Sequence, residues 1–317
     1  MNRPLMSKST AVEYDPQLAA RVGRTAKRSD FIFGLAGVAI LIVSMALLIA
    51  LLLDLALDGA GRINYEFLTS FPSRRAGSAG ILSAWVGTTL VMVVTAALAV
   101  PMGVMAGLYL EEYAPKNLIT TLIEINIGNL AGVPSIIYGL LALGLFVYML
   151  GLGQTIFVAG AVLALLILPV IIVSTREAVR SIPQTVKEGA YGIGADKWQT
   201  MSSFILPAAR PGILTGAIVG LSRAIGETAP VITIGALTYI AFLPPSPIQA
   251  GFPFINFDWL EAPFTLLPIQ MFNWLSRPQS EFHVNAAAAG VVLIAMTLVM
   301  NALAIYIRYR LRRHTMN

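Results

Sequence analysis

The chain has 317 residues, of which 57% are hydrophobic and only 12% are charged, whereas ordinary soluble domains carry about 25% charged residues. This composition places the chain in the membrane class rather than among soluble enzymes or binding domains, and its net charge is +5. With no cysteine and two histidines, it has no disulfides and almost no thiolate or imidazole ligands for a metal.

Long apolar stretches dominate the chain from residue 31 onward, after a polar N-terminal tail of residues 1–30. A spanning helix needs about 20 mostly apolar residues, and six stretches meet or approach that length. We predict spans at about 31–53, 81–110, 131–150, 155–173, 212–242 and 284–306. The first is too long for the apolar region of a signal peptide, and no small-x-small cleavage site follows it. One transmembrane domain, 31–313, is therefore expected.

The basic residues are distributed unevenly between the two sides of these spans. Sixteen of the 21 lysines and arginines lie on the side of the N-terminus, four lie on the other side, and Arg223 lies within a span. The positive-inside rule then predicts that both termini and the 183–207 loop are cytoplasmic. It also explains the net charge without nucleic acid. We expect arginines 308, 310, 312 and 313 to contact lipid head groups.

The largest external loop, 243–283, is rich in aromatic residues and prolines, and we predict a short helix over 267–275. Its aromatic side chains are typical of a belt at the lipid head groups. The alternative is a docking surface for a soluble substrate-binding protein, and the two interpretations are compatible.

The 188–207 segment reads EGAYGIGADKWQTMSSFILP and lies between two apolar spans. It resembles the EAA loop of ABC-importer permeases, whose pattern is Glu-Ala-Ala, three residues, Gly, nine residues, Ile-x-Leu-Pro. The matching residues are Glu188, Ala190, Gly194, Leu206 and Pro207, whereas Gly189 replaces alanine and Phe204 replaces isoleucine. The resemblance implies that a cytoplasmic ATPase binds this loop; the alternative is a solvated amphipathic loop.

Arg223 and Glu227 lie inside the fifth predicted span. A charged side chain at bilayer depth costs roughly 2.5–3.5 kcal/mol, so both side chains should face a cavity or a partner. Four residues apart on a helix, they can neutralise each other, although arginine before glutamate is the weaker order. The planar guanidinium also suits an oxyanion. Gly226 and Pro230 should loosen the helix here.

This segment resembles the Arg-Ala-x-Gly-Glu-Thr motif of the permease subunits of phosphate ABC importers. The matching residues are Arg223, Ala224, Gly226, Glu227 and Thr228, and the following Ala229-Pro230 is similar to the A-type subunit. Further resemblance at Pro134-Ser135-Ile136, Tyr138-Gly139, Ala286–Ala289, Asn301 and Arg308 extends it over about residues 80–313.

The Gly132-Val133-Pro134-Ser135 sequence opens the third predicted span. Free backbone N–H groups at a helix start attract anions, and transporters often aim such ends at their substrates. We therefore expect Ser135 to line the pathway beside Arg223, Glu227 and Thr228. An ordinary helix start or kink is the alternative.

The resemblance implies an all-α integral membrane fold, the six-helix transmembrane domain of a type I ABC importer. It implies a phosphate permease subunit that pairs with a C-type permease to enclose the pathway in a bacterial cell (inner) membrane, and whether an outer membrane surrounds it stays open. Two copies of a cytoplasmic ATPase and an external phosphate-binding protein would complete the complex. ATP and Mg would bind to the ATPase, because this chain has no Gly-x4-Gly-Lys-Ser/Thr loop, no catalytic residues and no cofactor of its own.

Three other functions remain open from the sequence. A permease for sulfate, molybdate or phosphonate would share the EAA loop but generally lacks the Arg-Ala-x-Gly-Glu-Thr motif. A secondary transporter or channel would need no cytoplasmic partner, which the EAA loop argues against. An intramembrane enzyme has no support, because the spans hold no paired histidines, metal-ligand cluster or Ser-His arrangement.

Overall fold

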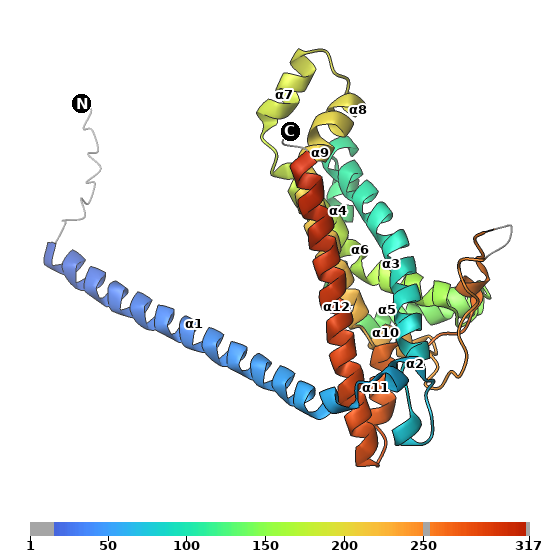
Figure 1. Cartoon of the computed structure of the whole chain (residues 1–317). Coiled ribbons are helices and arrows are strands. Elements are labelled where there is room, and N and C mark those ends of the chain that lie inside the picture. Colours follow the sequence, from blue (N-terminus) through green and yellow to red (C-terminus); the bar gives the residue numbers. More distant parts are fainter. Residues whose placement is uncertain (1–15, 250–253, 315–317) are drawn as a thin grey trace, which may run out of the picture. The chain divides into compact units, whose positions relative to one another are not determined.

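The computed structural model describes residues 16–249 and 254–314, with side chains at 30–249 and 254–310. The chain divides into two compact units, residues 1–54 and 55–317. Helix α1 (Pro16–Gly59) forms the described part of the first unit and continues into the second (Figure 1). Its start at Pro16 suits proline, which is well tolerated in the first helical turn. Residue 30 is therefore no helix boundary, and residues 1–15 of the predicted tail lie outside the described part.

The second unit is built almost entirely of helices. In chain order they are α2 (Tyr65–Thr69), α3 (Leu82–Leu108), α4 (Leu118–Leu130), α5 (Ser135–Ala142), α6 (Ile156–Arg180), α7 (Gln184–Gly192), α8 (Lys197–Gln199), α9 (Leu206–Ile225), α10 (Ala229–Thr233), α11 (Leu267–Leu275) and α12 (Ser280–His314). The π-helical turns are η3 (Tyr109–Tyr113), η4 (Leu143–Met149) and η5 (Thr200–Ile205), and the 3-10 turns are η1 (Ala60–Arg62), η2 (Ala76–Ser78) and η6 (Asp258–Glu261). The described residues hold one isolated antiparallel bridge, Ile248 with Ile255, and no longer strand.

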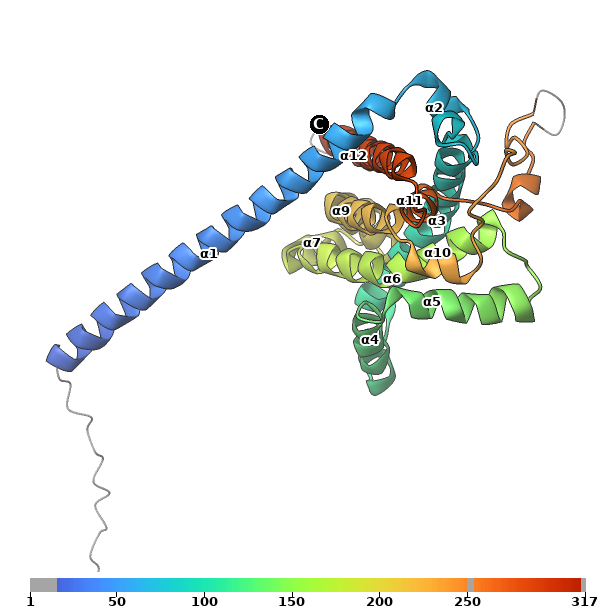
Figure 2. The same ribbon diagram turned by 90° about the horizontal axis from the view of Figure 1, so that it is seen from below.

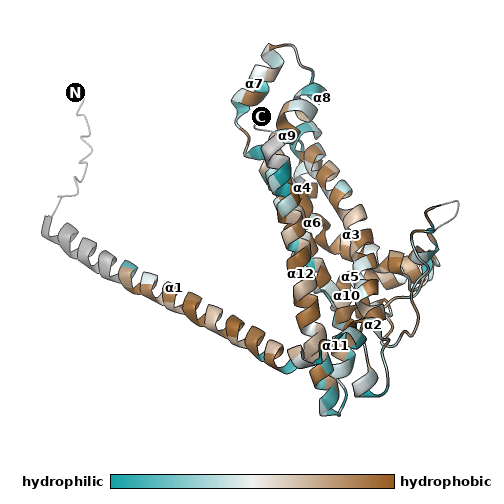
Figure 3. Ribbon diagram, in the orientation of Figure 1, coloured by the Kyte–Doolittle hydropathy of each residue, from teal (hydrophilic) through white to brown (hydrophobic). Residues whose placement is uncertain are grey.

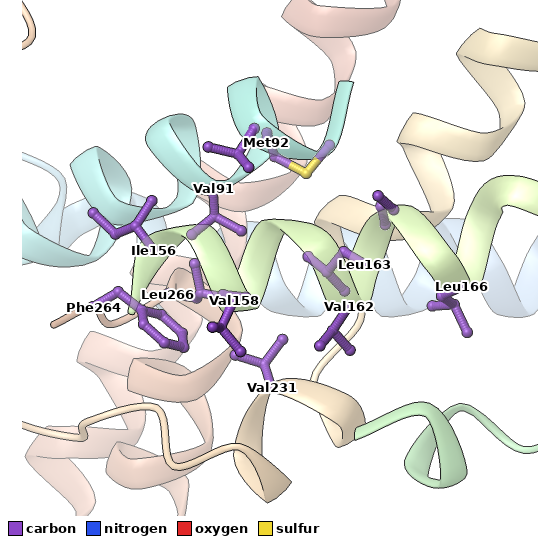
Figure 4. Packing of buried hydrophobic residues seen from close by; sticks show 14 of the residues in the cluster. Val91, Met92, Ile156, Val158, Val162, Leu163, Leu166, Val231, Phe264 and Leu266 are labelled. Carbon is purple, nitrogen blue, oxygen red and sulfur yellow. The ribbon is translucent and has the colours of Figure 1, made fainter. Parts of the chain in front are cut away.

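Helices α3 and α6 form the centre of this unit, and their close approach requires glycine. A Cβ atom on Gly107 would lie 2.9 Å from the Ile172 carbonyl oxygen, so no larger residue fits there without a shift. Around the contact, α3, α6, α10 and the 264–266 segment share one apolar core (Figure 4). The labelled side chains are Val91, Met92, Ile156, Val158, Val162, Leu163, Leu166, Val231, Phe264 and Leu266. This packing gives a rigid frame from which the other helices are positioned.

Five helical segments of the described chain are long and apolar enough to cross a membrane, or six if a bent pair counts as one more span. They are Asp30–Arg62, Leu82–Tyr113, Ile156–Arg180, Lys197–Ile225 and Ser280–Arg310, and the bent pair is Leu118–Leu130 with Ser135–Met149. Apolar residues cover α3, α6 and much of α12, whereas polar residues gather at α7 and α8 (Figure 3). The predicted all-α membrane fold is confirmed.

The third and fifth predicted spans were wrongly bounded. Residues 118–130, predicted as loop, form α4, which meets the helix from Ser135 at 106° because Gly132 and Pro134 interrupt it. The fifth helix runs over Lys197–Ile225 rather than 212–242. It ends at Gly226, before Pro230. The apolar residues that follow reflect burial, since Val231 and Ile234 are fully buried.

The predicted helix over 267–275 is confirmed as α11. However, an aromatic belt is the wrong interpretation for Trp259, Phe264 and Trp274, which are at most 8% exposed and pack in the core. Phe254, Phe257 and Phe272 are exposed in the described part of this loop. Helices α7 and α8 lie at one end of the unit, and α2 and α11 lie at the other (Figure 1).

Candidate functional site

The predicted EAA loop folds as a helical hairpin made of α7 and α8. Gly194 adopts φ +87°, a left-handed conformation that suits glycine and ends α7. Asp196 then begins α8 with a capping box, in which its carboxylate accepts from the Gln199 backbone N–H and Gln199 caps the Asp196 backbone in return. Local sequence therefore dictates the shape of this loop.

One side of the hairpin packs on the helical unit, and the other side is open. Ala190 is 2% exposed, and Val186 packs on a cluster that includes Met201 and Ile205. The outer side carries Glu188 and Gly189, with Tyr191, Ile193 and Trp198 exposed by 49, 76 and 69%. Large apolar side chains exposed together on a polar loop indicate a surface for another protein.

The motif residues take different positions in this hairpin. The Glu188 side chain makes no hydrogen bond or ion pair with any residue in the described part of the chain. A Cβ atom on Gly189 would meet nothing within 4 Å, so the alanine usual in the family pattern would fit there. Leu206 and Pro207 start α9 and are half-buried, so they position the loop rather than extend its outer surface.

Arg223 lies in the last turn of α9, at the break before α10. Its Nε donates to Glu227 Oε1 at 3.2 Å, with side-chain exposures of 40% and 19%. Glu227 lies beyond the helix end, where its backbone N–H donates to the Ala224 carbonyl oxygen at 3.2 Å. The predicted pair forms, but across a helix break rather than along one helix face. Within the described residues, the two terminal nitrogens of Arg223 bind no other side chain.

Helix α5 brings a second set of predicted residues to this break. It runs beside α10 (Figure 2), and a Cβ atom on Gly139 would lie 2.6 Å from Pro230 Cα. Ser135 begins α5 and is half-buried. No described hydrogen bond joins Ser135 to Arg223 or Glu227. Thr228 lies in the break itself, where its hydroxyl donates weakly to the Gly226 carbonyl oxygen at 3.5 Å.

Sequence reasoning missed two further polar features of this region. The Tyr138 hydroxyl donates to the Leu130 carbonyl oxygen at 2.9 Å and so bridges the bend between α4 and α5. Tyr138 also interacts electrostatically with Arg223. Asn126 and Asn129 are exposed on α4, where residues 111–130 had been predicted as loop. Recognising residues 118–130 as an apolar helix would have revealed these amides as membrane-depth polar groups.

The α7–α8 hairpin and the break at Arg223 and Glu227 lie at opposite ends of α9. The helix has 20 residues, so its ends lie about 30 Å apart. At 1.5 Å per residue, this separation matches the thickness of a bilayer core. Among the described residues, no group of three His, Cys, Asp or Glu side chains could hold a metal ion.

Comparison with known proteins identifies the family. Residues 99–316 match the model of the "binding-protein-dependent transport system inner membrane component" family. The chain is 30% identical over 285 residues to a probable ABC transporter permease, YqgI of Bacillus subtilis, covering 88% of this chain and 94% of that protein. It is 31% identical over 238 residues to the phosphate transport system permease PstA 1 of Mycobacterium tuberculosis, covering 75% and 73%.

Solved structures agree on the fold. A chain of a bacterial alginate ABC transporter, solved with a pentasaccharide-bound periplasmic protein, aligns with TM-score 0.62 and 14% identity over 92% of this chain and 98% of that one. A chain of the inward-facing methionine transporter MetNI aligns with TM-score 0.55 and 16% identity over 73% and 95%. The chain therefore belongs to the family of inner membrane components of binding-protein-dependent transport systems, as a PstA-type, multi-pass permease subunit of a type I ABC importer that works with an ATPase and a substrate-binding protein.

Proposed function

We propose that this chain carries phosphate, as the A-type permease subunit of an ATP-driven importer. Relatives from Mycobacterium tuberculosis and Yersinia pestis that are named PstA phosphate permeases share 31% and 30% identity with it. The Arg-Ala-x-Gly-Glu-Thr segment adds local support. A C-type permease subunit supplies the other half of the translocation pathway, and an external phosphate-binding protein delivers the anion.

The observation that carries this proposal is the geometry of Arg223. Its guanidinium is 40% exposed at a helix break and keeps both terminal nitrogens available beside Glu227. A planar guanidinium binds phosphate oxygens with paired hydrogen bonds. Glu227 repels the same anion and holds Arg223 when the anion leaves. A translocation pathway needs such weak binding, because tight binding would stop release.

In this proposal, Ser135 and Thr228 supply hydroxyl groups to the same pathway. Ser135 begins α5, where backbone N–H groups are free, and Thr228 lies in the helix break. Both can donate to phosphate oxygens as the anion passes. The pathway residues of this chain are thus Arg223, Glu227, Thr228 and Ser135.

The α7–α8 hairpin is the contact for the ATPase in this proposal. Its exposed outer side, with Glu188, Tyr191 and Trp198, supports that role. Ala190 packs the hairpin against the helical unit, and Gly194 forms its turn. Leu206 and Pro207 join the hairpin to α9. Two ATPase copies hold ATP and Mg, close on nucleotide binding and move the hairpins of the two permeases. The pathway then opens alternately to the two sides.

The orientation follows from the charge distribution. With the hairpin and both termini in the cytoplasm, 16 of 21 basic residues are inside. Arg308 Nη1 donates to Thr215 Oγ1 at 2.8 Å near this side of the membrane. The side chains of arginines 312 and 313, predicted to contact lipid, lie outside the described residues. A bacterial cell (inner) membrane is the location that we propose.

The test is ATP-dependent uptake of radiolabelled phosphate by proteoliposomes that contain the whole complex, with sulfate and molybdate as competitors. We expect uptake that requires ATP and that a tenfold excess of either competitor leaves unchanged. Uptake of labelled sulfate or molybdate in place of phosphate would overturn the substrate but keep the importer architecture. The alignments with methionine and alginate transporters show the fold alone and favour neither cargo.

A further inference from the structure

The π-helical turn η3, at the end of α3, contacts three different elements with three consecutive side chains. Glu111 contacts α6, Glu112 contacts α7 and Tyr113 contacts α8. The Ala114 backbone N–H donates to the Tyr109 carbonyl oxygen at 2.8 Å, which is the five-residue hydrogen bond of a π turn. Such turns are rare within α-helices and occur frequently at functional sites.

Glu111 joins the turn to α6 through two arginines. Arg180 binds both carboxylate oxygens, with Nε to Oε1 at 3.0 Å and Nη2 to Oε2 at 2.9 Å. Arg176 Nε adds a bond to Oε2 at 3.3 Å, and its Nη2 reaches Glu124 Oε1 on α4 at 2.8 Å. Paired charge-assisted bonds of this kind hold a fixed geometry. The end of α3 is thus fastened to α6 and α4.

Glu112 and Tyr113 join the same turn to the hairpin. Lys187 Nζ on α7 forms an ion pair with Glu112 Oε1, and these side chains are only 16% and 10% exposed. Lys197 Nζ on α8 lies over the Tyr113 ring, 4.6 Å from its centre. Both helices of the hairpin are therefore attached to one turn of α3. That turn lies far from the hairpin in sequence, at 75 residues between Glu112 and Lys187.

The chain segments on either side of α7 restrain its orientation less than its contacts with η3 do. It is joined to α6 through residues 181–183 and to α8 through the glycine turn at Gly194. Short turns of this kind allow a helix to rotate, whereas shielded ion pairs resist rotation because a lone charge would be left poorly solvated. The lateral contacts to η3, together with the packing of Val186 and Ala190, therefore restrain how α7 moves relative to the core.

We propose that Glu112, paired with Lys187, is a positioning residue for energy coupling, which makes the ATPase-binding hairpin and α3 move as one body. This inference rests on the proposed role of the α7–α8 hairpin as the ATPase contact. A push on α7 passes through Glu112 into α3, and through Glu111 into α6. The close contact between α3 and α6 at Gly107 then transmits this movement along both helices, which we expect to border the pathway.

The first test compares Glu112→Lys, Lys187→Glu and the combined exchange in the whole reconstituted complex. The measured quantity is labelled phosphate taken up per ATP hydrolysed. Each single variant should lower this ratio by at least about fivefold, the low end of measured allosteric coupling, while the ATPase subunit still copurifies. The exchange should restore it. Glu112→Gln keeps the shape and should lower the ratio less than Glu112→Lys.

Glu177→Lys is the matched control, because Glu177 is an exposed α6 carboxylate that reaches Arg180 at 3.6 Å. It should leave the ratio unchanged. A normal ratio in Glu112→Lys, or a ratio that the exchange does not restore, would overturn the inference.

A second measurement needs no knowledge of the cargo. The chain has no cysteine, so spin labels can be placed at Gln184→Cys on α7 and Met105→Cys on α3. The distance between them should stay constant when an ATP analogue and Mg bind the wild-type complex. It should change in Glu112→Lys, and a constant distance there would refute the role of Glu112.

Glu188→Arg separates failure of this inference from failure of the proposed function. If Glu188→Arg uncouples transport and Glu112→Lys does not, the hairpin binds the ATPase but Glu112 has no positioning role. If Glu188→Arg leaves binding and coupling normal, the hairpin is not the ATPase contact, and the inference fails with it.

Discussion

Arg223 meets two requirements with one side chain. Its Nε binds Glu227, which offsets the cost of a charge at membrane depth, and its terminal nitrogens bind no other described side chain, as the proposed contact with an anion requires. The break at Gly226 makes this division possible, because Glu227 approaches from beyond the helix end. In a continuous helix the carboxylate would lie along the guanidinium face, and less of that face would remain open.

We predict that Arg223→Gln lowers ATP-dependent phosphate uptake by about tenfold or more, since a hydrogen bond to a charged group contributes about 1.5–3 kcal/mol. The complex should assemble normally, as copurification of the ATPase would show. Arg223→Lys is the matched control and should retain more uptake, because it keeps the charge but loses the planar fork. Wild-type uptake by Arg223→Gln would restrict Arg223 to a structural partner of Glu227.

Exchange of the two charges tests whether Arg223 and Glu227 act only as an ion pair. Arg223→Glu combined with Glu227→Arg keeps an ion pair and moves the guanidinium across the break. We expect uptake to stay low, because the cation no longer occupies the position that the α9 end gives it. Uptake measured beside both single variants gives the answer, and rescue by the exchange would favour a pure ion pair.

At the scale of elements, contact between α5 and α10 decides whether Ser135 and Tyr138 lie near Arg223. Gly139→Ala places a methyl group 2.6 Å from the Pro230 backbone. We expect it to destabilise the subunit by about 1–3 kcal/mol, the usual cost of overpacking, and to reduce uptake. The thermal unfolding midpoint of the purified complex measures this. Gly144→Ala, in the adjoining η4, meets nothing within 4 Å and should leave the midpoint unchanged; equal midpoints would contradict the proposed packing role.

Sequence patterns located the continuous helices well but not the broken ones. The apolar run of α6 and the helix α11 could be placed because each forms one continuous helix, α6 despite the proline at position 169. Hydropathy extended the fifth span past Gly226, because Val231 and Ile234 are as apolar as lipid-facing residues although they face the protein core. Residue type reports that a side chain avoids water, and it does not report whether lipid or protein replaces that water.

The candidate sites show the same limit. Motif spacing singled out Arg223, Glu227 and the hairpin residues as candidates, since these patterns are local. Glu112 and Lys187 escaped notice because 75 residues separate them. Either residue alone reads as an ordinary charge at a helix end. Only the fold places them together.

At the scale of the whole molecule, the orientation of the chain can be tested directly. We predict that Ser276→Cys, at the end of α11, reacts with a membrane-impermeant maleimide in intact cells, because α11 should be external. Thr185→Cys, on α7, should react only after the membrane is permeabilised. The native chain contributes no background, since it has no cysteine. The reverse labelling pattern would invert the topology and place the hairpin away from any cytoplasmic ATPase.

Gly189 has a consequence for how this subunit can change over evolutionary time. Helix α7 has nine residues, and two of them are glycine, each of which lowers helix stability by about 1 kcal/mol relative to alanine. Open space surrounds the Gly189 Cα, so a methyl group could be added there without disturbing a described neighbour. A single codon change could therefore stiffen α7 while leaving the described core as it is. Under the proposed function, selection could in this way alter the contact with the ATPase separately from the choice of cargo.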